Sequence, residues 1–316
     1  MSADLTTIND LYEKINSDPH ELDDPNVAHL VIDHNKVLGQ HQVPGLHMDV
    51  DELEDGIKAV MRLDDNTVLE KQVHLCFGMY PEKGVQRIIM DVTIGKNAKI
   101  SLLSHCVFPY AIDVQHIMHG QIRVGEGSEY SYFERHVHSP KGGVKVYPNA
   151  KVEIGKRATF RTEFELLRGR VGLIEIDYEA TCQAESILEM NTRISGRADD
   201  VIKVREIGHL VGEHSKGVLT SKIAVRENAR AEVYNELTAT AAYARGHVDC
   251  SEIVQDNGIV SAIPIVRVEH PKAHITHEAA IGSVDNKQLE TLMSRGLSED
   301  DAVELIISGL LSRKKK

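Results

Sequence analysis

Aromatic residues and cysteines are scarce in this chain. It has no tryptophan, five phenylalanines and nine tyrosines among 316 residues, so aromatic side chains make up only 4%. This composition suits a thin, repetitive interior of Val, Ile, Leu and Ala better than one large globular core. The four cysteines, Cys76, Cys106, Cys182 and Cys250, lie far apart without a CxxC pair. That spacing disfavours a disulfide framework, a zinc ribbon and a thioredoxin-type motif.

Long apolar runs and an excess of basic charge are also missing. No stretch approaches the roughly 20 apolar residues that a membrane span needs, and the first residues, MSADLTTINDLYEKINSD, lack the apolar core of a signal peptide. We therefore expect a cytoplasmic protein. Lys and Arg number 36 against 48 Asp and Glu, a formal net charge of -12. This balance disfavours nucleic acid and anionic membranes as partners.

Several catalytic and nucleotide-binding motifs are absent. The sequence has no GxxxxGK[ST], so any energy from ATP must come from another subunit. A GxGxxG that opens a helix, GxSxG and HExxH are absent as well. The segment HEAA at 277–280 begins like HExxH, but position 281 is Ile.

What is present is a repeat. The stretches VTIGKNAKISLL, IRVGEGSEYSYF and VEIGKRATFRTEF each read as strand, tight turn and strand, and Ile94, Val124 and Ile154 recur at a step of 30. Weaker echoes follow to residue 254, with steps nearer 23 or 24. Short strands at a fixed step indicate units stacked in one direction. We predict a mainly β fold, a right-handed parallel β-helix over 68–282 between an N-terminal helical or irregular segment, 1–67, and a C-terminal helical segment, 283–316.

Both flanking segments have helical patterns. The apolar residues of LTTINDLYEKI, 5–15, recur at helical spacing. Near the C-terminus Gly296 suits the C-cap of one helix and Ser298 the N-cap of the next. That last helix is too apolar to stand free, so it either covers the open end of the solenoid or docks a partner. The residues that would make the partner contact are Leu289, Leu292, Met293, Leu297, Val303, Ile306 and Ile307.

Histidine is abundant, with 17 residues. His136 and His138 would share one strand face, while His116 and His119 are three residues apart in a segment without a clear pattern. With a third histidine, His136 and His138 could bind zinc and activate a water molecule. The chain would then be a β-helical zinc-dependent enzyme that acts on a small molecule. Hydrogen-bonded or solvent-facing histidines are the simpler interpretation.

Cys250 lies in the strand-like stretch GHVDCSEIV and shares a face with Val248. An inward thiol is either a small apolar filler or, with a base or second ligand nearby, a sulfur acceptor or iron ligand. One repeat further along the chain falls at 273–280, in AHITHEAAIG, which includes His277 and Glu278. We therefore expect this pair near Cys250. Because neighbouring strand residues alternate, only one of the two can face the same interior as Cys250.

These segments together resemble a known family. GHVDCSE, AIPIVRVEHPKAHITHEAAIGSVD and QLETLMSRGLSEDDAVELIISGLL are similar to the C-terminal half of the SufB/SufD proteins, the scaffold components of the SUF system of iron-sulfur cluster assembly. The resemblance covers roughly residues 85–312 and is most specific at HEAAIG and LMSRGL. Because both Cys250 and Glu278 are present, the chain resembles a short, archaeal-type form of SufB.

The resemblance implies a scaffold rather than an enzyme. Its β-helix would lie between helical segments, with a SufC-like ABC ATPase docked on the C-terminal helices. A nascent iron-sulfur cluster would be built transiently from sulfur that donor proteins deliver, and then passed to apo-proteins. By motif, Cys250 is the acceptor or iron ligand, Glu278 and His277 assist it, and Cys106 in SLLSHC receives sulfur first.

The resemblance also implies that two scaffold chains act together. The second chain would be another copy, in a homodimer, or a SufD-like paralogue. Whether a flavin in the complex supplies electrons stays open. The zinc-dependent enzyme and a purely structural partner of the ATPase are the alternatives.

Overall fold

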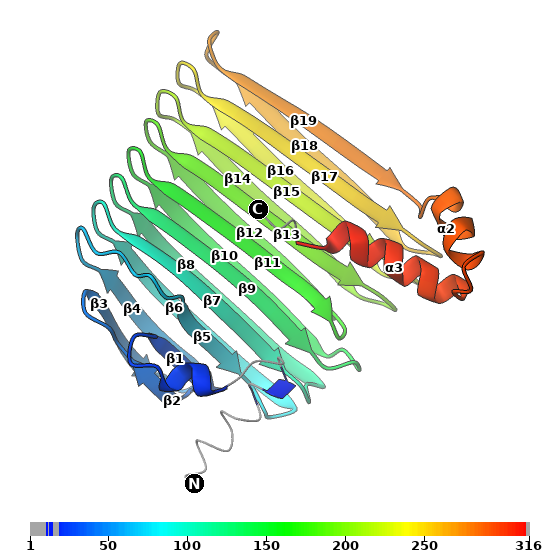
Figure 1. The fold of residues 1–316 in the computed structure, drawn as a ribbon, viewed down its shortest axis with the longest axis horizontal. Coiled ribbons are helices and arrows are strands. Elements are labelled where there is room, and N and C mark those ends of the chain that lie inside the picture. Colours follow the sequence, from blue (N-terminus) through cyan, green and yellow to red (C-terminus); the bar gives the residue numbers. More distant parts are fainter. Residues whose placement is uncertain (1–10, 12, 15–18, 314–316) are drawn as a thin grey trace.

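The structure is a computed structural model that describes residues 11, 13–14 and 19–313. It is a β-solenoid of about eight turns built from two sheets that face each other (Figure 1). Sheet A contains, in spatial order, β2 (Lys36–His41), β1 (His29–Asp33), β5 (Val73–Gly78), β7 (Lys99–Phe108), β9 (Glu129–His138), β11 (Thr159–Arg168), β13 (Ile187–Gly196), β15 (Lys216–Val225), β17 (Arg245–Val254) and β19 (His274–Gly282). Sheet B contains β3 (Leu46–Glu52), β4 (Gly56–Leu63), β6 (Lys83–Ile94), β8 (Asp113–Val124), β10 (Val144–Ile154), β12 (Leu173–Cys182), β14 (Val201–Leu210), β16 (Arg230–Ala239) and β18 (Ile259–Val268).

Alternation of side chains explains the two sheets. In β12 buried residues follow partly buried ones without a break, and the buried set points between the sheets. The chain passes from sheet B to sheet A through tight turns with one residue at positive φ, among them Asn97, Gly127 and Arg157. These are the turns of the three repeats seen in the sequence. The prediction of a mainly β solenoid with parallel strands is therefore confirmed.

The later repeat steps were predicted wrongly. In sheet B, Ile154 pairs with Cys182, Cys182 with Leu210, and Leu210 with Ala239. The steps are thus 28, 28 and 29 residues, not 23 or 24. Each turn must supply two strands of ten residues and two corners, so a shorter step would break the alignment of the inward residues.

The N-terminal segment differs from its prediction. Residues 29–63, expected to be helical or irregular, form β1 to β4. The helical residues described before them are Leu11, Glu13 and Lys14 and those of the short 3-10 helix η1 (Pro19–Asp23). β1 pairs antiparallel with β2, and β3 with β4, so two hairpins end the sheets on this side. The helix predicted over 5–15 lies outside the described residues, apart from Leu11, Glu13 and Lys14. Leu11 is buried against Val31, Cys76 and Val107 on the outer side of sheet A.

The C-terminal segment forms α2 (Asn286–Met293) and α3 (Glu299–Leu311). Ser298 is the N-cap of α3 as predicted, because its side chain accepts a hydrogen bond from the Asp301 backbone N–H. The C-cap of α2 is Ser294, and Gly296 adopts φ +95° in the turn that follows.

These helices do not cover the end of the solenoid. α3 lies along the outer side of sheet A over β13 and β15 (Figure 1). Within the described residues, β18 and β19 are the last strands of their sheets. The expectation that the C-terminal segment caps this end is therefore wrong, and an open end remains.

Candidate functional site

The open end of the solenoid exposes the inward side chains of its last turn. The registers with β16 and β17 place a mainly apolar set on this inward face: Val260, Ala262, Pro264, Val266 and Val268 on β18, and Ile275, His277, Ala279 and Ile281 on β19. Ile281 is 50% exposed and Val268 is 48% exposed. Corresponding residues one turn earlier, such as Leu237 and Val248, are fully buried. The last turn is therefore a core layer without a cover among the described residues.

Cys250 lies one layer inside this open end. It points inward from β17, is fully buried, and receives a weak hydrogen bond of 3.8 Å from the Asn235 amide. Burial raises the pKa of the Cys250 thiol. Beside it, the Ser221 hydroxyl donates to the Glu252 carboxyl at 3.1 Å, and burial raises the pKa of Glu252 to about 7. Cys250 is thus a protonated thiol in a polar pocket of the core, and metal or sulfur chemistry there requires its deprotonation.

His277 and Glu278 lie on the strand next to Cys250. β17 pairs with β19, and Cys250 has Ala279 as its direct partner, a step of 29 residues. The repeat had predicted this proximity. His277 aligns with Val248 and so shares the inward face of Cys250, whereas Glu278 aligns with Asp249 on the opposite face. Both are exposed. One chain therefore directs Cys250 and His277 into the open end and Glu278 away from it.

Cys106 is far from this end. It lies on β7, separated from β17 by five strand spacings within sheet A. At about 4.8 Å per spacing, the two cysteines are about 24 Å apart. They therefore cannot share one ion within a chain, and Cys106 belongs to different surroundings.

Those surroundings form a second, fully buried group. Ligand atoms of Cys106 on β7, His116 on β8 and His136 on β9 lie within 4.8 Å of one another. This is the one set of three possible metal ligands that comes together in the part of the chain that the structure describes. We call it the interior Cys-His cluster. The predicted shared strand face of His136 and His138 is confirmed, whereas the approach of His116 and Cys106 to them was not predicted.

Two more side chains of β9 contact the interior Cys-His cluster. Glu134 Oε1 lies 2.7 Å from His136 Nε2 and 3.8 Å from Cys106 Sγ. His138 Nε2 lies 3.1 Å from His136 Nδ1. Burial lowers the pKa of His136 and of His138 to about 3, lowers that of His116 well below its usual range, and raises that of Cys106. Burial also raises the pKa of Glu134 to about 7. The three imidazoles are therefore neutral and the thiol is protonated at neutral pH.

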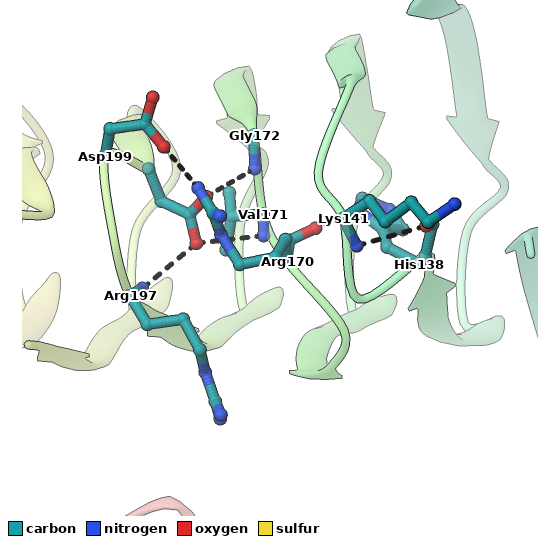
Figure 2. Close-up of polar contacts among 9 residues, drawn as sticks. His138, Lys141, Arg170, Val171, Gly172, Arg197 and Asp199 are labelled. Carbon is teal, nitrogen blue, oxygen red and sulfur yellow. Dashed lines mark hydrogen bonds and ion pairs between the residues drawn. The ribbon is translucent and has the colours of Figure 1, made fainter. Parts of the chain in front are cut away.

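A buried carboxylate organises the loop next to His138. Asp200 is fully buried and accepts hydrogen bonds of 2.9 to 3.0 Å from the backbone N–H groups of Val171, Gly172 and Arg197 and from Arg170 Nε. Figure 2 shows Arg170, Val171, Gly172 and Arg197 gathered around these contacts. The Arg170 carbonyl in turn accepts a hydrogen bond of 2.9 Å from His138 Nδ1. The orientation of His138 is thus set by the backbone of the next turn.

The residues expected to bind a partner differ in exposure. Ile307 is buried against Ala224 and Val284 on the outer side of sheet A, and Leu289, Val303 and Ile306 pack partly on the same cluster. Met293 is 41% exposed, while Leu292 and Leu297 are half-buried. Ile307 therefore contacts its own chain. Of the predicted set, Met293 offers the most free surface.

None of the helices in the described part of the chain is long and apolar enough to span a bilayer.

Comparisons with known proteins match most of the chain. The family model for the SUF system FeS cluster assembly SufBD core domain matches residues 81–310. An iron-sulfur cluster assembly SufBD family protein of Pyrococcus horikoshii is 38% identical over 285 residues, which are 90% of this chain and 87% of the relative. One of Methanocaldococcus jannaschii is 36% identical over 293 residues, 93% of each chain.

The likeness to a bacterial SufB is shorter. The iron-sulfur cluster assembly protein SufB of Bacillus subtilis is 36% identical over 69 residues, 22% of this chain and 15% of the relative. The open question of a flavin in the complex receives no support from the names of these three relatives. Because the family model covers most of the chain and two relatives match it almost from end to end, the chain belongs to the SufBD family of iron-sulfur cluster assembly proteins.

Proposed function

We propose that this chain is a SUF scaffold on which a nascent iron-sulfur cluster is assembled at the open end of the solenoid, together with a SufC-like ABC ATPase, before transfer to apo-proteins. The observation that carries the proposal is the pairing of β17 with β19, which puts His277 on the same inward face as Cys250 at the uncovered end. Membership of the SufBD family supplies the iron-sulfur chemistry. In this function the cluster is cargo and not a resident cofactor.

The Cys250 thiolate is the proposed acceptor of sulfur and ligand of iron. A fully buried thiol with a raised pKa is protected from oxidants but is also unreactive. The site therefore works only after an opening movement, which the ATPase partner would supply. A ligand set with few thiolates holds a cluster less firmly than four cysteines, and this suits a site that releases its product.

A second chain would complete the site. Within one chain Glu278 faces away from Cys250, so it can assist only as a ligand supplied to another copy or after rearrangement. The exposed apolar layer at the open end fits a second copy of this chain or a SufD-like paralogue. We favour the homodimer because this one chain carries Cys250, His277 and Glu278 together.

The SufC-like ATPase would dock on the C-terminal helices. Met293 and Leu305, 41% and 52% exposed, are the apolar side chains there that are free for such a contact. Cys106 keeps its proposed role as an early sulfur acceptor only if sulfur can reach the solenoid interior, since the thiol is fully buried.

The test is anaerobic reconstitution of the chain co-expressed with its ATPase. We expect labile iron and acid-labile sulfide in the wild-type complex, transfer of the cluster to an apo-ferredoxin, and loss of both in Cys250→Ala. Cys182→Ala is the matched control, because Cys182 is also a fully buried thiol but lies in sheet B away from the open end. A Cys250→Ala complex that still forms and transfers clusters would make the chain a structural partner of the ATPase instead.

A further inference from the structure

Apart from the conditional role of Cys106 as an early sulfur acceptor, the proposed function does not use the interior Cys-His cluster, which lies about five strand spacings from Cys250. We propose that Cys106, His116 and His136 hold a divalent transition-metal ion of the zinc type inside the solenoid. The three side chains come from three strands and two sheets. Cys106 and His136 are direct partners in the β7–β9 register, and His116 reaches the same place from sheet B.

His116 gives the first argument. It is fully buried, and neither of its ring nitrogens has a hydrogen-bond partner among the described residues. A buried polar group without a hydrogen-bond partner destabilises the folded state. The apolar neighbour Phe108, with its ring centroid 4.9 Å from that of His116, provides no compensation by hydrogen bonding. A metal ion bound to the bare ring nitrogen satisfies that one of the two nitrogens, because coordination replaces its missing hydrogen bond.

The hydrogen-bond chain through His138 gives the second argument. A carbonyl oxygen only accepts, so His138 Nδ1 must carry the proton that it donates to Arg170 O. In a neutral ring His138 Nε2 is then bare and accepts from His136 Nδ1–H. His136 Nε2 in turn is the bare nitrogen, and it accepts a hydrogen bond of 2.7 Å from the Glu134 carboxyl. Its lone pair points to the side where Glu134 Oε1 and Cys106 lie.

The run of hydrogen bonds from Arg170 through His138 to His136 resembles the support that metal-binding histidines receive in proteins. A ligand histidine commonly donates its second N–H to an acceptor that fixes the ring orientation and the tautomer. Here His138 is that acceptor and the Arg170 carbonyl orients His138. Asp200 holds the segment from Arg170 to Gly172 through three hydrogen bonds. Asp200 and Arg170 are positioning residues, since they act on His136 only through His138.

The donor set selects the metal. One thiolate and two imidazoles suit zinc and its neighbours in the first transition row, and exclude calcium and magnesium, which take oxygen ligands. A tetrahedral zinc site separates its ligand atoms by about 3.3 to 3.5 Å, given bonds of about 2.3 Å to sulfur and 2.0 Å to nitrogen or oxygen. The ligand atoms within 4.8 Å need only small rotations to reach this. Glu134 Oε1, beside two of the three ligands, is the nearest oxygen for a fourth position.

Metal binding by the interior Cys-His cluster releases protons, and the bound ion is enclosed by the protein. Cys106 loses its thiol proton, and the proton shared by Glu134 Oε1 and His136 Nε2 is displaced when the nitrogen binds the ion. Cys106 and His116 are 0% exposed and His136 is 1% exposed, so no substrate reaches the ion. The ion therefore stabilises the fold and enters while the chain folds. The interior cluster does not serve as the active site of a zinc enzyme.

The first experiment measures metal content. The full chain is expressed without a metal-affinity tag in zinc-supplemented cells and dialysed against a chelator, and its metals are quantified. We expect close to one zinc or iron per chain, lost in Cys106→Ser and in His116→Phe. His105→Asn and Cys182→Ser are the controls, because they alter a buried histidine and a buried thiol outside the interior Cys-His cluster.

The second experiment does not depend on the variants folding. Wild-type chain is unfolded, stripped of metal and refolded anaerobically with Co²⁺. Coordination by Cys106 gives a thiolate-to-cobalt charge-transfer band in the near ultraviolet and intense visible bands typical of four-coordinate cobalt. The bands should persist in Cys250→Ser, which separates this site from the cluster scaffold. A wild-type protein that refolds without these bands and contains less than a tenth of an equivalent of metal overturns the proposal. So does metal content that is unchanged in a folded His116→Phe.

Discussion

Single buried carboxyl groups contribute strongly to this solenoid, and Asp200 is the clearest case. Its two oxygens accept four hydrogen bonds, two each, from Arg170, Val171, Gly172 and Arg197. In Asp200→Asn one oxygen becomes an NH₂ group that faces two N–H donors. We expect a loss of about 3 kcal/mol in the free energy of unfolding, measured as a lower urea midpoint. Asp199→Asn is the control, because Asp199 also pairs with Arg170 but is 90% exposed, and it should change the midpoint little.

Glu206 gives the chain a pH-dependent stability. It is fully buried, accepts a hydrogen bond of 2.8 Å from Thr192, and has its pKa raised to about 7 by burial. An unfolded glutamate has a pKa of about 4.3. Between these values the unfolded chain releases a proton that the folded chain keeps. The stabilising effect is therefore complete below about pH 4.3, declines as the pH rises to about 7, and is absent above it.

Glu206→Gln has no carboxyl group at this position, so we expect the variant to lose the part of the pH-dependent fall in stability that Glu206 causes. Relative to wild type, the variant should gain up to about 3 kcal/mol between pH 4.5 and pH 8, since one pKa unit is about 1.4 kcal/mol. Thermal melts at the two pH values measure it. Exposed Glu153→Gln should follow wild type. If the difference between Glu206→Gln and wild type is the same at both pH values, Glu206 does not titrate in this range.

Residue-level prediction from sequence succeeded where the repeat carried the information. One repeat step from Cys250 led to the strand that carries His277 and Glu278. Because side chains alternate along a strand, His277 and Glu278 were expected on opposite faces. The same step of 30 also relates Cys106 to His136, a relation that the sequence shows but that was not used. His116 could not be found this way. It reaches the cluster across the interior from the other sheet, and an in-sheet repeat contains no information on which residues of opposite sheets meet.

At the scale of elements, the position of α3 follows from a few contacts. Ile307 and Leu311 are buried on sheet A, the Arg226 guanidinium lies 2.6 Å from the Glu304 carboxylate, and Arg193 donates to the Leu311 carbonyl at 3.2 Å. The sequence predicted α3 and its N-cap because these depend on local patterns. It did not predict the docking on the side of the solenoid, because apolar residues at helical spacing show which face is buried but not against what.

Docking of α3 can be tested through Ile307. Ile307→Ala removes most of a buried side chain, a change that costs about 2 to 5 kcal/mol where the surroundings do not collapse. The helix should then leave sheet A more often, and limited proteolysis should cleave the segment 297–313 several times faster than in wild type. Leu305→Ala, at a position 52% exposed on the same helix, should be cleaved at the wild-type rate. Equal rates for the two variants would contradict the docked position.

At the scale of the whole molecule, the two ends of the solenoid differ. Hairpins β1–β2 and β3–β4 finish the sheets at the N-terminal end. They were not predicted from the sequence because they fall before the regular repeat begins. Among the described residues the opposite end finishes with β18 and β19, and no further strand pairs with their outer edges, which lie next to an exposed apolar layer. Such an edge promotes strand pairing with another chain unless it is blocked.

We therefore expect the chain to form a dimer through the open end. The contact removes the exposed layer around Ile281 and Val268 from water, which stabilises the pair by about 25 cal/mol per Å² of apolar surface. Light scattering should give twice the 35.1 kDa chain mass for wild type. Ile281→Lys places a charge within that layer and should produce monomers. Ile112→Lys, in the turn between β7 and β8, is equally exposed and should remain dimeric because it lies turns away from this end. A monomeric wild type, or a dimer that Ile281→Lys leaves intact, would assign the open end to a different partner.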